Sequence, residues 1–250
     1  MKEMLKITFC LAVTCLIAGA ILGAVYFFTE PARRASQVAN EGERVRSLLG
    51  LEAKETVMEV RRYGDLNGES FVGYLFPESF DLYDLDGAPL QKIPVKEILK
   101  SAEEKDRFVK NRFPETEFTG RFFITPKGYV TESVQYGFKS PIRIFVALTP
   151  DFKIRGVEVI SHEEDPGLGD EITKPEFKNQ FLGLNAEELE GVKVVKGPPP
   201  KNPKERLPKT IYGVTGATIS SKALTEGVQK GVSQLRYRLK IALPKEVPYE

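Results

Sequence analysis

The sequence predicts an α+β protein with one N-terminal transmembrane helix, then an antiparallel or mixed sheet, and a long C-terminal helix. Three observations support this fold class. An uncharged apolar run covers residues 7–28, strand-like segments fill the middle of the chain, and apolar residues recur every three or four positions from about 221 to 243. These periodicities distinguish strands from amphipathic helices.

Composition limits the classes of function. The chain has 250 residues, with 36 Lys and Arg against 35 Asp and Glu, so its formal net charge is +1. A nucleic-acid-binding protein needs a clear basic excess or a basic stripe, and we therefore expect no nucleic-acid partner. Both cysteines, Cys10 and Cys15, lie inside the apolar run. The rest of the chain thus offers no thiolate zinc site or cysteine-ligated iron–sulfur cluster, and we expect no metal site.

The apolar run 7–28 favours a retained membrane anchor. At about 1.5 Å per residue it spans roughly 30 Å of hydrocarbon. A cleaved signal peptide is the alternative, but its apolar region is usually shorter and ends in small residues, whereas this run ends in aromatic residues. Lys2 and Lys6 favour an inside N-terminus, and Arg33 and Arg34 favour the opposite. Charge alone therefore leaves the orientation open.

The region between the anchor and the C-terminal helix has mixed patterns. We expect a polar helical stalk from Pro31 to about Leu49, a hairpin over residues 55–75, an exposed helix over Pro94–Phe113, and a Pro- and Lys-rich loop over Gly197–Lys209. Strand-like segments start near Arg121, Gly128, Pro141 and Lys153. We therefore divide the chain into an anchor (1–30), a stalk with an accessory α+β region (31–119) and a C-terminal domain (120–250).

The stretch YGVTGATISSKALTEG, Tyr212 to Gly227, gathers small and hydroxyl residues just ahead of the C-terminal helix. A helix N-terminus has unsatisfied N–H groups and a partial positive charge, and Gly and Ala allow the backbone to approach an anion closely. Phosphate binding is one interpretation. The alternative is that Ser220 or Ser221 merely caps the helix. The stretch contains no P-loop pattern, so the residues alone leave both interpretations open.

The segment VTGATISSKAL resembles the flavinylation motif of FMN-binding domains in two related proteins. These are the G subunit of Rnf-type electron transport complexes and the C subunit of the sodium-translocating NADH:quinone reductase. The family pattern is Ser/Thr/Asp-Gly-Ala-Thr-x-Ser/Thr. Its Thr after Ala carries FMN through a phosphoester bond, which a separate flavin transferase installs. That position is Thr218 here. The resemblance implies further cofactor-binding residues, namely Thr215, Gly216, Ala217, Ser220 and Ser221.

Two other segments agree with this resemblance. SHEEDPGLGDEI resembles the family's HxETPGLG stretch beside the flavin ring, with Asp165 where Thr is usual. It implies cofactor-binding residues at Glu164, Asp165, Gly167, Leu168 and Gly169. The PGLG turn lets the backbone approach a flat ring, Leu168 can pack on that ring, and either acid can hydrogen-bond or place charge near it. The alternative for the two acids is a solvated acidic turn. The third segment, YGFKSPIRIFVALTPDFKIRGVEV, resembles a family stretch but departs from it at Ser140 and at Asp151-Phe152.

The resemblance covers the anchor and about Gly120–Leu243, whereas Pro31–Thr119 matches poorly. It implies that residues 120–250 form an FMN-binding domain with covalent threonyl-FMN. The implied function is an electron-transfer subunit, without catalytic residues of its own, in an Rnf-type ferredoxin:NAD oxidoreductase that couples electron transfer to sodium or proton translocation. The implied setting is the cytoplasmic membrane, with the soluble domain on the outer, periplasmic side. The implied partners are other membrane and redox subunits and a flavin transferase.

Three alternatives have different consequences. The chain can be a C-type subunit of the sodium-translocating NADH:quinone reductase, which length does not distinguish from the Rnf type. It can be a cofactor-free, membrane-tethered assembly module, which predicts a colourless protein. It can be a hydrolase using Ser220 or Ser221, but then His162, the only histidine, must be the base, and no GxSxG elbow is present.

Overall fold

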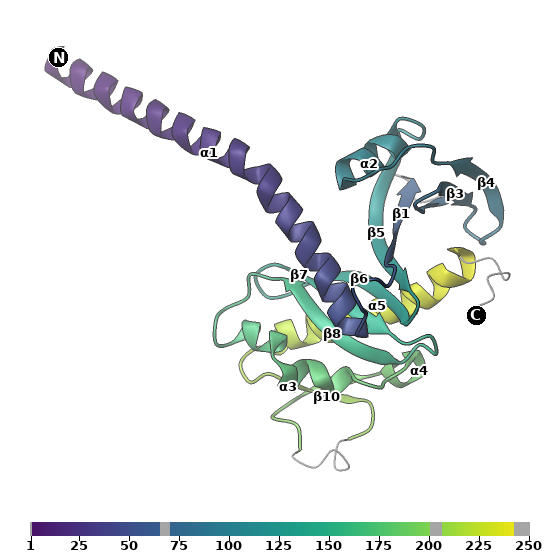
Figure 1. The fold of residues 1–250 in the computed structure, drawn as a ribbon. Coiled ribbons are helices and arrows are strands. Elements are labelled where there is room, and N and C mark those ends of the chain that lie inside the picture. The colour runs from purple at the N-terminus through teal and green to yellow at the C-terminus, as the bar shows by residue number, and fades with distance from the viewer. Residues whose placement is uncertain (1, 66–70, 201–206, 243–250) are drawn as a thin grey trace. The chain divides into compact units, whose positions relative to one another are not determined.

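The computed structural model describes residues 2–65, 71–200 and 207–242, drawn in Figure 1. The chain divides into two compact units, Met1–Arg44 and Val45–Glu250. Nearly all of the first unit is helix α1 (Lys2–Leu49). Its segment Lys6–Glu30 is long and apolar enough to cross a membrane. The expected anchor and the expected stalk are therefore parts of one continuous helix.

The second unit is built on an eight-stranded sheet in which neighbouring strands are antiparallel. The strand order is β4-β3-β2-β1-β5-β6-β7-β8. The strands are β1 (Met58–Asp65), β2 (Val72–Leu75), β3 (Ser79–Tyr83), β4 (Pro89–Pro94), β5 (Thr116–Thr125), β6 (Gly128–Tyr136), β7 (Pro141–Leu148) and β8 (Ile154–Ser161). A separate parallel pair joins β9 (Lys193–Lys196) to β10 (Thr210–Gly213).

The long helix α5 (Thr218–Ala242) packs on β6 and β7, as Figure 1 shows. Its buried stripe includes Leu224, Val228 and Leu235, which join the main core with side chains such as Ile144. This confirms the apolar periodicity expected from about residue 221, although Pro244, the expected stop, lies outside the described residues. The shorter helices are α2 (Ala102–Lys110), α3 (Pro175–Lys178) and α4 (Ala186–Leu189), with 3-10 turns η1 (Gly169–Thr173) and η2 (Asn179–Phe181).

The last turn of α1 belongs to the second unit and covers another part of the sheet. Val45 and Leu49 are fully buried there against Phe123, Val130 and Phe145. Side chains of β5, β6 and β7 thus pack both in this cluster and, through Phe122 and its neighbours, in the main core. The apolar N-terminal helix, the mostly antiparallel sheet and the long C-terminal helix together confirm the predicted fold class.

In the accessory region, one expected helix has a different start and the expected hairpin is present. The helix expected over Pro94–Phe113 is wrong in its first part, because residues 95–101 are not helical. Helix α2 starts at Ala102, where Ser101 and Glu104 form a capping box that fixes the start. The expected hairpin exists as the antiparallel pair β1 and β2, but its turn at residues 66–70 lies outside the described residues.

Candidate functional site

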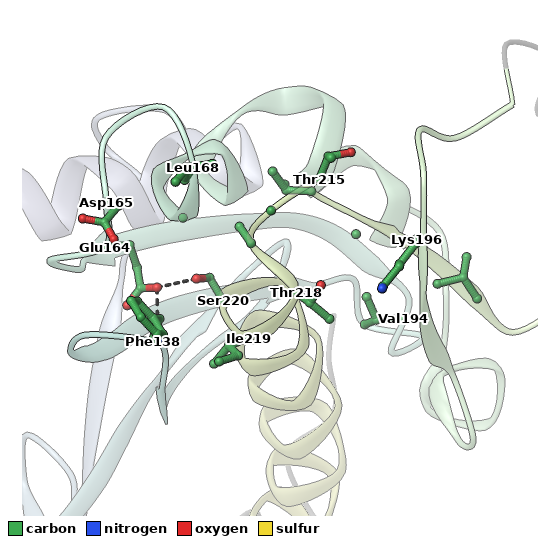
Figure 2. Close-up of a pocket in the computed structure, with 16 residues that line it drawn as sticks. Phe138, Glu164, Asp165, Leu168, Val194, Lys196, Thr215, Thr218, Ile219 and Ser220 are labelled. Carbon is green, nitrogen blue, oxygen red and sulfur yellow. Dashed lines mark hydrogen bonds between the residues drawn. The ribbon is translucent and has the colours of Figure 1, made fainter.

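A pocket of about 600 Å³ lies at the start of α5, where four connecting segments meet (Figure 2). These are the loop before α5, the loop between β8 and η1, the turn between β6 and β7, and the end of β9. Most of the residues expected to bind the cofactor line it: Glu164, Asp165, Leu168, Gly169, Thr215, Gly216, Ala217, Thr218 and Ser220. Gly167 and Ser221 are not in the lining, although each is adjacent in sequence to a residue that is.

The start of α5 presents backbone N–H groups at this pocket. The first helical hydrogen bond runs from the N–H of Ser221 to the carbonyl oxygen of Ala217, at 3.0 Å. The N–H groups of Thr218, Ile219 and Ser220 precede it and have no acceptor inside the helix. Ala217 carries no side-chain oxygen that could cap them. The positive end of α5 is therefore available to an anion in the pocket.

Ser220 and Ser221 do not cap the helix, so that interpretation is wrong. Both lie inside the first turn and are buried. The hydroxyl of Ser221 accepts a hydrogen bond from the N–H of Val214 at 3.0 Å, and the hydroxyl of Ser220 donates to the carboxylate of Glu164. The two serines instead fix the loop before α5 and the loop after β8 to the helix.

Glu164 holds the wall of the pocket together. Its side chain is only 5% exposed, and its carboxylate accepts from the N–H groups of Phe138 (3.1 Å), Lys139 (3.0 Å) and Ser140 (3.4 Å). Burial alone would raise the pKa of Glu164, but the Ser220 hydroxyl and these three N–H groups outweigh it, and the pKa is lowered. Glu164 is thus a charged positioning residue and not part of a solvated acidic turn.

Asp165, Leu168 and Gly169 follow Glu164 in the sequence and also line the pocket. Asp165 forms an ion pair with Lys139 and remains partly exposed. A Cβ atom on Gly169 would lie 2.7 Å from the Cβ of Glu164 and 2.9 Å from the Ser220 hydroxyl, so only glycine allows this close approach. Leu168 lies over Gly216, where an added Cβ would be 3.0 Å from Leu168 Cδ2. Gly167 adopts a φ of +75° in the same turn.

The sequence reasoning missed part of the lining: Phe138, Val194, Val195, Lys196, Gly213, Val214 and Ile219. Figure 2 shows the side chain of Lys196 pointing toward Thr218. The residues of β9 reach the pocket because β9 pairs with β10, so that Lys196 lies opposite Gly213. No local sequence pattern indicates this pairing, because a long loop separates β9 from β10.

The two ends of the pocket differ in chemistry. One end offers the N–H donors of α5, the Thr218 hydroxyl and the Lys196 cation, which suit a phosphate. At the other end the exposed apolar side chains of Phe138, Leu168 and Ile219 form a lip that suits a flat ring. The volume lies within the range of small-molecule sites. The residues present therefore fit FMN, whose phosphate and ring need these two environments.

Comparison with known proteins agrees with this geometry. Residues 137–233 match the FMN-binding domain family. The chain is 28% identical over 234 residues to the G subunit of the proton-translocating ferredoxin:NAD(+) oxidoreductase complex of Clostridium ljungdahlii, covering 94% of this chain and 92% of that one. It is 34% identical over 106 residues to the G subunit of the ion-translocating oxidoreductase complex of Methanosarcina acetivorans, covering 42% of this chain and 50% of that one.

A solved structure supports the fold. The crystal structure of NqrC from Shewanella oneidensis superposes with a TM-score of 0.52 at 19% sequence identity, covering 82% of this chain and 99% of that one. The Clostridium alignment covers 94% of the chain and therefore includes most of residues 31–119. Residues 137–233 therefore match the FMN-binding domain family, within a chain that is similar to the G subunits of ion-translocating oxidoreductase complexes of the Rnf type.

Proposed function

We propose that this protein is a membrane-anchored flavoprotein subunit that carries FMN in the pocket at the start of α5, esterified to Thr218. It relays electrons within an Rnf-type ferredoxin:NAD oxidoreductase complex that couples electron transfer to sodium or proton translocation. The observation that supports this most is the place of Thr218. It is the first residue of α5, it lines the pocket beside the uncapped helix start, and it occupies the attachment position of the motif.

The chain's own residues have distinct parts in this proposal. In the transfer, the Thr218 oxygen forms a bond to the phosphorus of an FMN donor, the bond from that phosphorus to its leaving group breaks, and the hydroxyl proton goes to the leaving group. The chain thus gains the mass of FMN minus water. The first N–H groups of α5 and the ammonium of Lys196 offset the phosphate charge. The lip residues Phe138, Leu168 and Ile219 offer apolar surface to the ring. FMN, when bound, supplies the redox chemistry, and the protein orients it and sets its electrostatic surroundings.

The remaining parts of the proposal rest on the relatives. Their names describe subunits of ion-translocating complexes. We therefore propose other membrane and redox subunits as partners and a flavin transferase for maturation. Helix α1 is the single-pass anchor in the cytoplasmic membrane, with the soluble unit on the outer, periplasmic side. A C-type subunit of the NADH:quinone reductase is the alternative within the same family.

The hydrolase alternative has no geometric support. His162 Nδ1 accepts a hydrogen bond from the N–H of Glu164 at 3.2 Å. Ser220 donates to the Glu164 carboxylate, and Ser221 is fully buried. Neither serine is hydrogen-bonded to the histidine among the residues that the structure describes, so a serine–histidine pair is lacking there.

The decisive experiment is intact mass spectrometry of the full chain co-expressed with a flavin transferase. We expect a gain of one FMN minus water, flavin fluorescence that survives denaturation, and peptide mapping to Thr218. Thr218→Val should lose the adduct while its far-UV circular dichroism stays that of the wild type. Thr215→Ser is the matched control. Thr215 is exposed, and serine keeps the hydroxyl group that the motif has at this position, so this variant should retain the adduct. A colourless wild-type chain beside an active transferase would favour the assembly module instead.

A further inference from the structure

A second cavity, of about 560 Å³, lies along α5 away from the flavin pocket, where the helix faces β1, β5 and β6. No residue lines both cavities in the described part of the chain. The lining of the second one is strongly cationic. It contains six basic side chains and one carboxylate: Arg61, Arg62, Arg121, Arg143, Lys230, Arg238 and Glu132.

Half of these cations already have acidic partners. Arg61 pairs with Asp106 at 2.9 Å. Arg121 and Arg143 both pair with Glu132, at 2.6 Å and 2.5 Å. Burial alone would raise the pKa of Glu132, but the two arginines outweigh it and lower the pKa, so this carboxylate is charged. The one acidic group in the lining is therefore already engaged by two arginines.

Arg238 and Arg62 have no acidic partner among the residues that the structure describes. Arg238 is only 7% exposed; its Nη2 donates to Gln234 at 2.9 Å, but its Nη1 is buried with no hydrogen-bond acceptor among them. Arg62 donates through Nη1 to the Thr119 hydroxyl at 2.9 Å, and its Nε is buried without an acceptor in the same part of the chain. Burial and then the nearby Arg62 lower the pKa of Arg238 to about 10, and it remains charged at neutral pH.

An irregularity in the backbone of β5 brings the guanidinium groups of Arg62 and Arg238 to the second cavity. The β1–β5 register shifts between Arg62 and Tyr63, so that Thr119 is an extra residue in β5. Gly120 follows with a φ of +142°, a conformation that favours glycine, and an added Cβ there would lie 3.7 Å from Arg238 Nη1. Such bulges bend a strand and re-aim its side chains, and they are frequent next to binding sites. From α5, Lys230 and Arg238 lie eight residues apart on the same helix face.

We propose that this second cavity binds a phosphate monoester group through Arg62, Arg238 and Lys230. A buried charge without a partner is costly, and a bound anion offsets that cost. A phosphate monoester carries a charge of about −2 and three terminal oxygens. These match two guanidinium groups that have no acidic partner in the described part of the chain better than the single charge of a carboxylate does. Its source can be a soluble phosphate compound or a phospholipid headgroup of the same chemistry.

The test is ³¹P NMR titration of inorganic phosphate into the full chain in detergent micelles, at constant ionic strength. We expect saturable binding that weakens about tenfold or more in Arg238→Gln, since one charge-assisted contact is worth at least about 1.4 kcal/mol. The matched control is Arg236→Gln. It makes the same charge change two residues earlier on α5, at an exposed side chain paired with Glu187, and should bind phosphate like the wild type.

Several outcomes would overturn the proposal. These are no saturable binding by the wild type, equal weakening in Arg236→Gln, or acetate binding as strongly as phosphate. If Arg238→Gln does not fold, Arg62→Gln and Lys230→Gln provide the same comparison. Glycerol phosphate and vesicles containing phosphatidic acid then separate the sources. Arg238-dependent binding of the soluble ester assigns a soluble ligand, binding of the vesicles alone assigns a lipid headgroup, and binding of neither contradicts the proposal.

Discussion

At the level of single residues, the buried carboxylate of Glu164 joins parts of the pocket that lie far apart in the sequence. Glu164 joins the turn after β6 to the first turn of α5, across 26 and 56 positions in the sequence. The motif resemblance pointed to Glu164 as a residue beside the ring, but its hydrogen bonds to three backbone N–H groups could not be predicted. They depend on where residues 138–140 fold, and no local pattern encodes that position.

Glu164→Gln should lower the free energy of unfolding by about 2 kcal/mol at pH 7, because an amide nitrogen would face backbone donors. The folded-state pKa of Glu164 is lowered, so its contribution is present above its unfolded pKa of about 4.3 and is lost as pH falls through the folded value. In urea titrations the gap between wild type and variant should therefore begin to shrink below about pH 5 and should keep shrinking as the pH falls through the lowered folded-state pKa.

Asp165→Asn is the control for this substitution. Asp165 is partly exposed and pairs with Lys139 at the surface, so its loss should cost no more than about 1 kcal/mol. An equal cost for the two variants at pH 7 would show that the hydrogen bonds of Glu164 do not support the pocket.

Gly169→Ala should destabilise the protein by about 1–3 kcal/mol and reduce flavin incorporation, because the new methyl group would overlap Glu164 and Ser220. Gly64→Ala is the control, since a Cβ there would make an ordinary contact of 3.4 Å with Thr119. Thermal unfolding and the flavin content after co-expression measure the two effects. A Gly169 variant that matches the control in both measurements would contradict the close packing.

At the level of elements, helix α5 shows what periodicity can and cannot predict. The apolar spacing correctly indicated a helix from about residue 221, because one face of α5 packs on β6 and β7. The true start at Thr218 was missed, because the serines that suggested a cap are bonded to Glu164 and Val214. The helix α2 differs from its prediction in the opposite direction, since it starts later than the apolar pattern of residues 94–100 predicts. The Ser101–Glu104 capping box fixes that later start.

Gly227 and Gly231, on the packed face of α5, should respond differently to substitution by alanine. Alanine is favoured over glycine in a helix by about 1 kcal/mol. A Cβ on Gly227 would lie 2.5 Å from Ile144 Cδ1, whereas one on Gly231 would lie 3.3 Å from Ser133 and Thr131. We expect Gly227→Ala to lower the free energy of unfolding by about 1–3 kcal/mol and Gly231→Ala to be close to neutral. Urea unfolding of both variants tests this, and the reverse order would show that α5 is not held at this distance from the sheet.

At the level of the whole molecule, the sheet is continuous across the domain boundary proposed from the sequence. Position 120 lies inside β5, whose partner β1 comes from the accessory region, with Val60 opposite Phe122. Both residues belong to the same core cluster. The sequence offered no sign of this, because long-range strand pairing leaves no local pattern. The buried position of Arg238 has the same cause, since β1 and β5 lie over it. The boundary at 120 therefore remains a proposal about function.

A fragment comparison tests this view. We expect residues 45–250 to unfold cooperatively, and residues 120–250 to be markedly less stable, because removing β1 exposes Phe122 and leaves an edge of β5 unpaired. Circular dichroism during thermal unfolding of both fragments measures the difference. Equal melting temperatures would mean that the first four strands add nothing to the stability of the rest.

The uninterrupted length of α5 has one more consequence. Thr218 and Arg238 lie near opposite ends of the helix, about 30 Å apart at 1.5 Å per residue. Over that distance a unit charge and a phosphate charge of about −2 interact by only about 0.3 kcal/mol in water, and by about 1 kcal/mol at an effective dielectric constant near 20. Adding an electron to the flavin should therefore have only a small electrostatic effect on the arginines of the second cavity. The flavin midpoint potential should therefore change by no more than about 50 mV when phosphate binds near Arg238.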